Sequence, residues 1–426
     1  MKLPEKPFDT KKIIDEDAEG FIKFIRDENS MSLASEYNKR YLYWSELKYR
    51  IDDERERKYT WSLMKLLRSN NYEKFNLKNI GMIYSLLSDF NKKLHMFDKN
   101  LAGNIQIKGK SLNLQESYII SSLMEEAIAS SQIEGAATTR RIAKAMLREK
   151  RKPKNKSEKM ISNNYETMRY ILENRDRPLS ESFIIKIQEL MTKGTMEDPE
   201  DEGRFRDNDD ITVGNGDIVA HVPPKYKEVP ALMNKLYEFV NNPSDEFIHP
   251  IIKGIILHFL IGYIHPFNDG NGRTARSIFY WYMLSQEYWL FEYMAVSKRI
   301  LRSRVKYDLA YLYTEYDEMD LTYFIKYNIE AIENSLNDMI KYIRHQQKEQ
   351  EKTKKIITKN PDLSLRQALI LEEFMKNDTK GFTIKEIMET YGISYQTART
   401  DLLLLSKKNF ITKKIAGKTF VYLYNS

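Results

Sequence analysis

The chain has 426 residues, a length typical of two or three domains, and its charged and apolar fractions of 30% and 42% are those of a folded globular protein. Its net charge of +7 permits contact with nucleic acid or ATP but requires neither. Cysteine is absent, which excludes disulfides, thiolate metal sites and a cysteine nucleophile. The first residues lack the apolar core of a secretory signal, and no apolar run is long enough to cross a bilayer. We therefore expect a cytoplasmic protein with no membrane partner.

Apolar residues recur at spacings of three and four along most of the chain, which predicts a mainly α-helical protein. Residues 1–100 are expected to form a helical N-terminal region, in which 61–75 is one amphipathic segment. A core follows over residues 101–345. Within it, an apolar helix begins near Pro250 and ends near Ile264.

One segment of the core departs from the helical pattern. The stretch "ITVGNGDIVAHVPP", residues 211–224, has β-branched runs on either side of a Gly-Asn-Gly turn and is closed by two prolines. It predicts a β-hairpin, which in a helical protein should project from the surface because it cannot bury both faces. His221 lies on its outgoing strand and is expected at the surface.

Beyond the core, residues 346–362 are almost wholly polar and are interpreted as a helix end and linker. Residues 363–426 then read as three helices and a hairpin around Gly417, which resembles a winged helix-turn-helix domain. Its third helix would enter a DNA major groove and its wing would meet phosphates. A protein-contact role for the domain remains the alternative. The residues proposed for DNA contact are Tyr395, Gln396, Thr397, Arg399, Lys413, Lys414 and Lys418.

The stretch "HPFNDGNGRTAR", residues 265–276, joins the apolar helix to a second helix that begins near Gly272. Gly270, Asn271 and Gly272 allow several backbone N–H groups to face one point at a helix N-terminus, which favours an anion. Arg273 and Arg276 are three residues apart, so they share a face of the new helix and suit a polyphosphate.

Three further side chains of this stretch complete the chemistry. Asp269 would be repelled by an anion bound at these N–H groups unless Mg²⁺ bridged the carboxylate and a phosphate. His265 is suited to take a proton near neutral pH. Phe267 is expected to anchor the loop to the core. The pattern predicts a magnesium–nucleotide site with a histidine base, although a structural loop closed by ion pairs is the alternative.

The stretch also resembles the signature of the Fic (filamentation induced by cAMP) family, H-P-F-x-[DE]-G-N-G-R-x-x-R, in full. The resemblance extends over most of residues 100–345. It implies an all-helical core that transfers AMP from ATP to a Tyr, Thr or Ser hydroxyl of a protein. It assigns His265 as the base, Asp269 to Mg²⁺, and the glycines, Asn271 and the two arginines to the phosphates.

The resemblance implies two further features. The hairpin at 211–222 would be the family's flap, which positions the target chain by strand addition through Ile211, Thr212, Val213, Ile218 and Val219. Tyr307 is the candidate for stacking on adenine. In the Doc branch, which phosphorylates its targets, a lysine precedes the first motif arginine. Here that residue is Gly272, so adenylylation is favoured over phosphorylation.

A second motif lies upstream, in the predicted helix near 116–136. Ser130, Glu134 and Gly135 match the family's inhibitory-helix pattern [ST]-x-x-x-E-[GN]. The ordinary interpretation is a solvated helix end. Beside a complete Fic loop, the resemblance implies that Glu134 faces Arg276, takes the place of the γ-phosphate and restrains the enzyme.

The sequence therefore predicts an autoinhibited protein adenylyltransferase that uses ATP and Mg²⁺. The alternatives are a nucleotide-sensing DNA-binding regulator and an enzyme that removes AMP with the help of Glu134. The expected partners are a hydroxyl-bearing target protein, the enzyme itself through self-modification, DNA, and a second copy of the chain in a homodimer.

Overall fold

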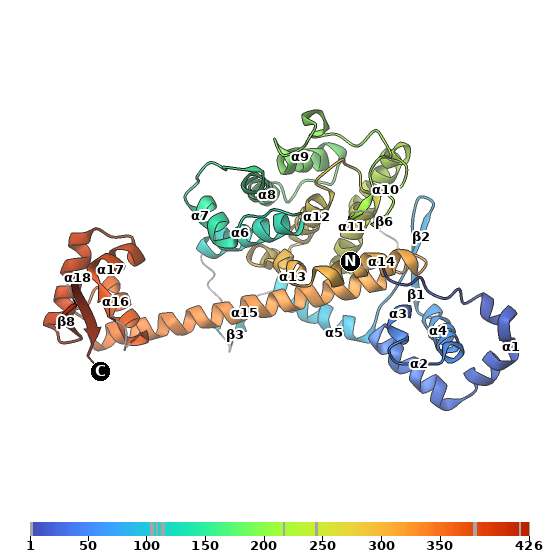
Figure 1. The fold of residues 1–426 in the computed structure, drawn as a ribbon, viewed down its shortest axis with the longest axis horizontal. Helices are drawn as coiled ribbons and strands as arrows, with labels where there is room; N and C mark the ends of the chain where they lie inside the picture. The colour runs from blue at the N-terminus through green and yellow to red at the C-terminus, as the bar shows by residue number, and fades with distance from the viewer. Residues whose placement is uncertain are drawn as a thin grey trace. The chain divides into compact units, whose positions relative to one another are not determined.

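The computed structural model describes residues 3–102, 106–107, 110–111, 116–215, 218–242, 246–377, 381–416 and 419–425. Two compact units make up the chain, Met1–Asn337 and Asp338–Ser426. The predicted fold class, a helical core with short hairpins followed by a winged helix-turn-helix domain, is confirmed (Figure 1). None of the helices in the described ranges is long and apolar enough to span a bilayer.

The N-terminal region packs around Tyr43, Trp44 and Trp61. Its helices are α1 Lys12–Ile25, α2 Glu28–Arg40, α3 Trp44–Leu47 and α4 Glu54–Ser69. The prediction of a helix through residue 75 is wrong, because α4 ends at Ser69 and strand β1 Tyr72–Leu77 pairs with β2 Ile80–Ser85. The two asparagines between α4 and β1 are poor helix formers, so the chain leaves the helix there.

The core continues through shorter elements that surround two central helices. It contains α5 Ser88–Phe97, η1 Asp98–Ala102, β3 Gln106–Ile107, β4 Lys110–Ser111, α6 Glu116–Ile133, α7 Arg140–Arg148, α8 Lys156–Glu173, α9 Glu181–Thr192, η2 Pro199–Asp201, η3 Tyr226–Glu228, α10 Val229–Asn241, α11 Pro250–Ile264, α12 Asn271–Ser285, η4 Trp289–Tyr293, α13 Val296–Arg302 and α14 Arg304–Tyr316.

Helices α11 and α12 form the centre of this core. Helix α11 is apolar around most of its circumference and buried, as expected for a helix enclosed by others. It begins at Pro250, and its N-cap His249 accepts a hydrogen bond from the Ile251 N–H. Gly254 allows α12 to approach closely, since a Cβ there would lie 2.5 Å from Met283. The functional loop is thus held between two rigid helices.

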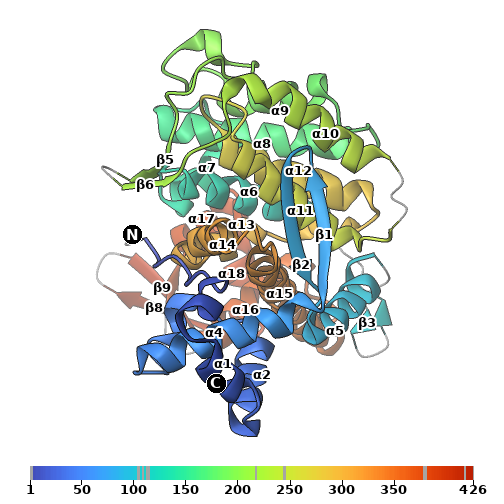
Figure 2. The ribbon, with the colours of Figure 1, turned by 90° about the vertical axis from the view of Figure 1, so that its right-hand side faces the viewer.

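The predicted hairpin is present as β5 Val213–Asn215 and β6 Ile218–His221, at the edge of the first unit (Figure 2). Residues 216–217 of its turn lie outside the described residues. The expectation that His221 is at the surface is wrong. Its ring is buried between the backbone oxygen of Tyr263 and the carboxylate of Glu315, so the base of the hairpin is anchored to α11 and α14.

Helix α15 spans Thr322–Lys359, so most of the predicted linker is helical. Its polar residues are good helix formers, and residues 322–360 contain no glycine or proline. The second unit then follows the predicted order, with α16 Leu365–Lys376, α17 Ile384–Tyr391, α18 Tyr395–Lys407, β8 Ile411–Ala416 and β9 Thr419–Tyr424. A third strand, β7 Phe382–Thr383, pairs with β9 and was not foreseen. Gly417 and Lys418 lie outside the described residues.

Candidate functional site

The loop between α11 and α12 is closed by its own side chains. The side-chain amide of Asn271 accepts from the Phe267 N–H at 2.9 Å and donates to the Phe267 carbonyl at 2.7 Å. Phe267 is fully buried and lies beside Phe205, with ring centroids 5.4 Å apart. Gly270, with φ of 85°, caps α12 at its N-terminus. The loop is therefore a fixed turn that presents the first N–H groups of α12.

His265 ends α11 in a left-handed conformation with φ of 49°, which is unusual for a residue with a side chain. Its Nδ1 lies 3.1 Å from the Gly262 carbonyl oxygen. Because a carbonyl only accepts, Nδ1 carries the proton and Nε2 keeps a free lone pair. Burial lowers the pKa of His265 to about 4, so the ring is neutral near pH 7.

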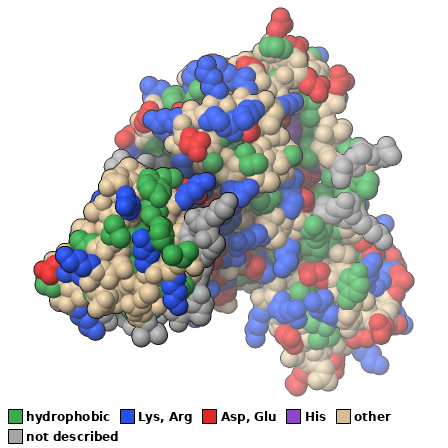
Figure 3. Space-filling model, turned by 60° about the vertical axis from the view of Figure 1, so that its left-hand side comes forward, with side chains coloured by type: hydrophobic (Ala, Val, Ile, Leu, Met, Phe, Trp, Pro, Cys, Tyr) green, Lys and Arg blue, Asp and Glu red, His purple; other side chains and the backbone are tan. Residues whose placement is uncertain are grey.

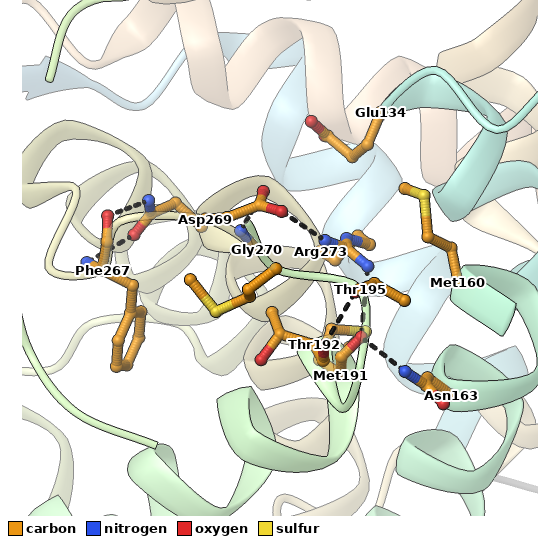
Figure 4. A network of polar contacts seen from close by, with 12 residues as sticks. Glu134, Met160, Asn163, Met191, Thr192, Thr195, Phe267, Asp269, Gly270 and Arg273 are labelled. Atoms are coloured by element: carbon orange, nitrogen blue, oxygen red, sulfur yellow. Dashed lines mark hydrogen bonds and ion pairs between the residues drawn. The ribbon is translucent and has the colours of Figure 1, made fainter. Parts of the chain in front are cut away.

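Arg273 is fully buried, and its guanidinium lies between Asp269 and Met191 at the end of α9 (Figure 4). One Nη donates to the Met191 carbonyl at 3.1 Å and the other lies 3.4 Å from Asp269. Its Nε has no partner among the groups the structure describes. A buried donor without an acceptor is costly, and an oxygen of a bound anion would satisfy it.

Arg276 is also buried, and its guanidinium is held by the end of α6. Its Nε donates to Ser130 Oγ at 2.9 Å, and one Nη donates to the Ser130 carbonyl at 3.0 Å. The same Nη lies 2.9 Å from Glu134 Oε1. Burial raises the pKa of the Glu134 carboxyl, but the charges of Arg276, Arg304 and Arg273 more than offset this and lower it. Glu134 is therefore an anion at neutral pH.

Glu134 fills the space above the loop, toward which it projects from the end of α6 (Figure 4). A Cβ placed on Gly272 would lie 2.3 Å from Glu134 Oε1 and 3.2 Å from an Nη of Arg276. The carboxylate thus lies directly against the glycine backbone at the start of α12. The anion-binding position predicted from the sequence is occupied by a side chain of the protein itself.

Asp269 is the candidate for holding Mg²⁺. Its side chain is 51% exposed, and its Oδ1 accepts from the Gly270 N–H at 2.5 Å. The described residues contain no group of three or more His, Asp or Glu that could hold a metal ion. An exposed carboxylate beside an anion-binding turn fits Mg²⁺ only together with a phosphate, because Mg²⁺ commonly takes one or two carboxylates and completes its shell with substrate and water.

The structure reveals two anchors of α6 that the sequence analysis missed. Glu126 is buried and accepts hydrogen bonds from the Ser297 N–H, from Ser297 Oγ and from the Tyr280 hydroxyl. Arg304, at the start of α14, donates from Nη1 to the Ile133 carbonyl and pairs with Asp308 at 2.8 Å. These long-range contacts leave no local pattern in the sequence. They fix the helix that carries Glu134.

Tyr307 is buried, and its hydroxyl lies 2.9 Å from Nε2 of His258. Its ring lies among His258, Tyr311, Phe324 and Tyr327. Its contact with adenine stays a prediction. Of the hairpin residues, Ile211 and Thr212 precede β5, Val213 begins it, and Ile218 and Val219 are exposed on β6.

In the second unit, α18 begins at the N-cap Ser394, whose side chain accepts from the Thr397 N–H. In Figure 3 the second unit, at the lower left, shows basic and apolar side chains and few acidic ones on the face turned to the viewer. Tyr395, Gln396 and Arg399 are exposed at the start of the helix. Asp401, inside it, is buried and accepts from Arg366 and Gln367, which orients α18 on α16.

Comparisons with known proteins match both units. The model of the Fic/DOC family matches residues 178–283, and that of the DeoR-like helix-turn-helix domain matches 366–421. The chain is 37% identical over 79 residues to a protein adenylyltransferase Fic of Drosophila willistoni, and 36% identical over 78 residues to one of Nematostella vectensis. Each match covers 18% of this chain, and the chain spans 15% and 17% of these relatives.

Solved structures share the fold over a larger part of the chain. A Fic family protein from Desulfovibrio desulfuricans gives a TM-score of 0.52 at 19% identity, covering 79% of this chain and 95% of that one. A Fic-1 fragment from C. elegans gives 0.50 at 18% identity, covering 74% and 84%.

Proposed function

This chain is a Fic-domain protein with a C-terminal DeoR-like helix-turn-helix domain, and we propose that it is a protein adenylyltransferase restrained by its own Glu134. The observation that carries the proposal is the complete "HPFNDGNGRTAR" loop with Arg276 bound to Glu134. Short matches to proteins named protein adenylyltransferase support it.

The chemistry follows from the state of His265. Its neutral ring offers Nε2 as a proton acceptor, because Nδ1 donates to Gly262. Nε2 takes the proton of a target hydroxyl as the hydroxyl oxygen bonds to the α-phosphorus of ATP. The bond from that phosphorus to the bridging oxygen breaks, and pyrophosphate leaves with its electron pair. The target keeps AMP as a phosphodiester.

The phosphates would be held by the turn and its two arginines. The N–H groups at Gly270, Asn271 and Gly272 would face phosphate oxygens, and the Nε of Arg273 would gain the acceptor that it lacks. Arg276 would grip the terminal phosphates once Glu134 leaves. A Mg²⁺ ion held by Asp269 would neutralise charge on the leaving pyrophosphate.

The restraint follows from competition for Arg276. Glu134 bonds the guanidinium and lies against Gly272, so a γ-phosphate cannot take the same place. ATP would bind in a shifted pose with its α-phosphorus misaligned. A displacement of about 1 Å lowers a reaction rate by about 100-fold.

The test uses the purified wild-type protein and its Glu134→Gly and His265→Ala variants, each with Mg²⁺ and ATP labelled at the α- or the γ-phosphate. Label is counted on the enzyme and on proteins of a lysate. We expect label from the α-phosphate only, increased in Glu134→Gly and absent in His265→Ala. Label from the γ-phosphate would instead make the protein a kinase, as in the Doc branch.

Removal of AMP is the alternative reaction for the same site. Glu134 is an anion, and its side chain is 31% exposed, so it could activate a water molecule. Incubation of an AMP-labelled protein with wild type and with Glu134→Gln separates the two directions, because only removal depends on the carboxylate as a base.

DNA binding is a second function favoured by the DeoR-like match and by the exposed start of α18. In this reading the Fic core senses nucleotide and the second unit binds DNA. Retention on heparin and a salt-dependent shift of a promoter fragment test it. The proposed partners also include a hydroxyl-bearing target, the enzyme itself and a second copy of the chain. The absence of cysteine is consistent with the cytoplasm as the proposed location.

A further inference from the structure

Arg206 lies in the segment between η2 and β5 and is buried beside the catalytic loop. Its backbone N–H donates to the Pro266 carbonyl at 2.9 Å, and its Nε donates to the His265 carbonyl at 2.9 Å. The neighbouring Phe205 ring rests on Phe267. Two successive carbonyls of the catalytic loop are therefore held by one residue from a distant part of the chain.

These bonds act on the peptide that follows a strained residue. His265 has φ of 49°, a conformation that is unfavourable for a residue other than glycine and persists only when its surroundings enforce it. The bonds to the His265 and Pro266 carbonyls fix the orientation of both peptides. They thereby fix the direction in which the imidazole leaves the backbone.

The other end of the guanidinium reaches both sides of the hairpin. One Nη donates to the Asn208 carbonyl at 2.9 Å and lies 3.2 Å from Asp209 Oδ1, just before β5. The other Nη donates to the Pro224 carbonyl, just after β6. Asp209 also accepts from the Tyr226 N–H at 2.6 Å, which ties this network to the segment beyond the hairpin.

We propose that Arg206 is a positioning residue that holds the proton-accepting histidine and the target-binding hairpin in one fixed geometry. The planar guanidinium has N–H donors in three directions. They donate to the catalytic loop and to the segments at the two ends of the hairpin. A target chain seated on β6 would thus present its hydroxyl at a constant distance from Nε2 of His265. This inference rests on the proposed transferase function.

A lysine at this position could not replace the arginine. An ammonium group is a compact charge on a flexible stem, so it cannot reach three separated carbonyls at once. A lysine would keep the positive charge but lose the hydrogen bonds to the separated carbonyls. Glutamine would lose both the charge and these hydrogen bonds. Comparing the two variants therefore separates the effect of the hydrogen bonds from that of the charge.

The test uses Arg206→Lys and Arg206→Gln in the Glu134→Gly protein, with Arg204→Gln as the matched control. Arg204 lies in the same segment and is 44% exposed, and its ion pairs are with Asp201 and Asp207. ATP binding is measured by calorimetry, and transfer of α-labelled AMP to lysate proteins is measured over a range of pH.

We expect both Arg206 variants to bind ATP within about twofold of the parent, since Arg206 does not touch the anion-binding turn, and to transfer AMP about 100-fold more slowly. The Arg204 control should match the parent. The charges that act on His265 are those of His221, Glu134 and Arg206, and the Arg206 charge is one that lowers its pKa. The pH below which the transfer rate falls should therefore be higher in the glutamine variant and nearly unchanged in the lysine variant.

Asp209→Ala serves as a second variant if those proteins fail to fold. Asp209 is half exposed, and alanine removes the Oδ1 that accepts from Arg206 and from the Tyr226 N–H, so it loosens the hairpin end of the network. A loss of transfer of about tenfold with unchanged ATP binding would support the inference. Transfer at the parent rate in folded Arg206 variants, or in Asp209→Ala, would overturn it. No transfer by the Glu134→Gly parent would overturn the proposed function and this inference with it.

Discussion

Glu134 and Arg276 meet at 2.9 Å although they are 142 positions apart in the chain. The pair joins the end of α6 to the first turns of α12 and lies against the backbone of Gly272. The side chain proposed to restrain the enzyme and the arginine proposed to bind phosphate therefore contact each other directly.

Glu134→Gln tests whether the charge or the shape of this side chain restrains the enzyme. Glutamine can still occupy the space above Gly272, but it lacks the charge that pairs with Arg276. We expect AMP transfer by Glu134→Gln to lie between that of wild type and Glu134→Gly, with the glycine variant about 100-fold above wild type. Equal rates for all three proteins, measured with α-labelled ATP, would contradict the restraint.

Arg304→Gln should weaken the restraint without touching the phosphate site. Arg304 donates to the Ile133 carbonyl next to Glu134, so its loss frees the end of α6. We expect transfer about tenfold above wild type, below the level of Glu134→Gly. Lys306→Ala, on the exposed side of the same helix, is the control and should behave as wild type. A rate no higher than that of the control would show that α6 is held by other contacts.

The pH dependence of transfer follows from His265. Its pKa is lowered to about 4 by burial, and in the proposed mechanism the ring can accept a proton only when it is neutral. The rate should therefore stay nearly constant from about pH 8 down to about pH 5 and fall as the pH approaches the pKa. Glu134 raises this pKa, so its removal shifts the fall to still lower pH. A fall centred near pH 6.5 in a protein that remains folded would show that the ring is solvated.

Arg399→Ala tests the second unit. Arg399 is exposed near the start of α18, and in a complex with DNA it would meet a base or a phosphate. We expect weaker binding to DNA. If the contact is to a phosphate, the slope of the logarithm of the binding constant against the logarithm of the salt concentration should be smaller by about 1. Lys407→Ala, at the opposite end of α18, should leave binding unchanged. Equal DNA binding by the two variants would exclude this orientation.

The sequence predicted the elements whose signals are local. Pro250 marked the start of α11, and the β-branched runs within residues 211–224 marked the strands β5 and β6. The helix predicted through residue 75 was wrong because Tyr72 and Phe75 continue an apolar spacing of three while lying in a strand. Strand β7 was missed for a different reason, because a segment of two residues is too short to show a repeating pattern.

The residue types of the site could be predicted from the sequence, but most of the contacts between them could not. The residues of "HPFNDGNGRTAR" lie in one short loop and the first turns of α12, so their proximity follows from sequence alone. The buried roles of Arg206 and Glu126 could not be inferred, because each depends on partners far along the chain. His221 was misplaced for the same reason, since its partners Tyr263 and Glu315 belong to other helices.

The bare backbone at Gly272 limits which variants of this loop can coexist with Glu134. A Cβ at that position would lie 2.3 Å from Glu134 Oε1, so any side chain there requires the carboxylate to move. A lysine there would displace the Glu134 carboxylate and add a positive charge beside Arg276 in the same step. Under the proposed function, one substitution at this residue would therefore change both the proposed phosphate-binding turn and the proposed restraint.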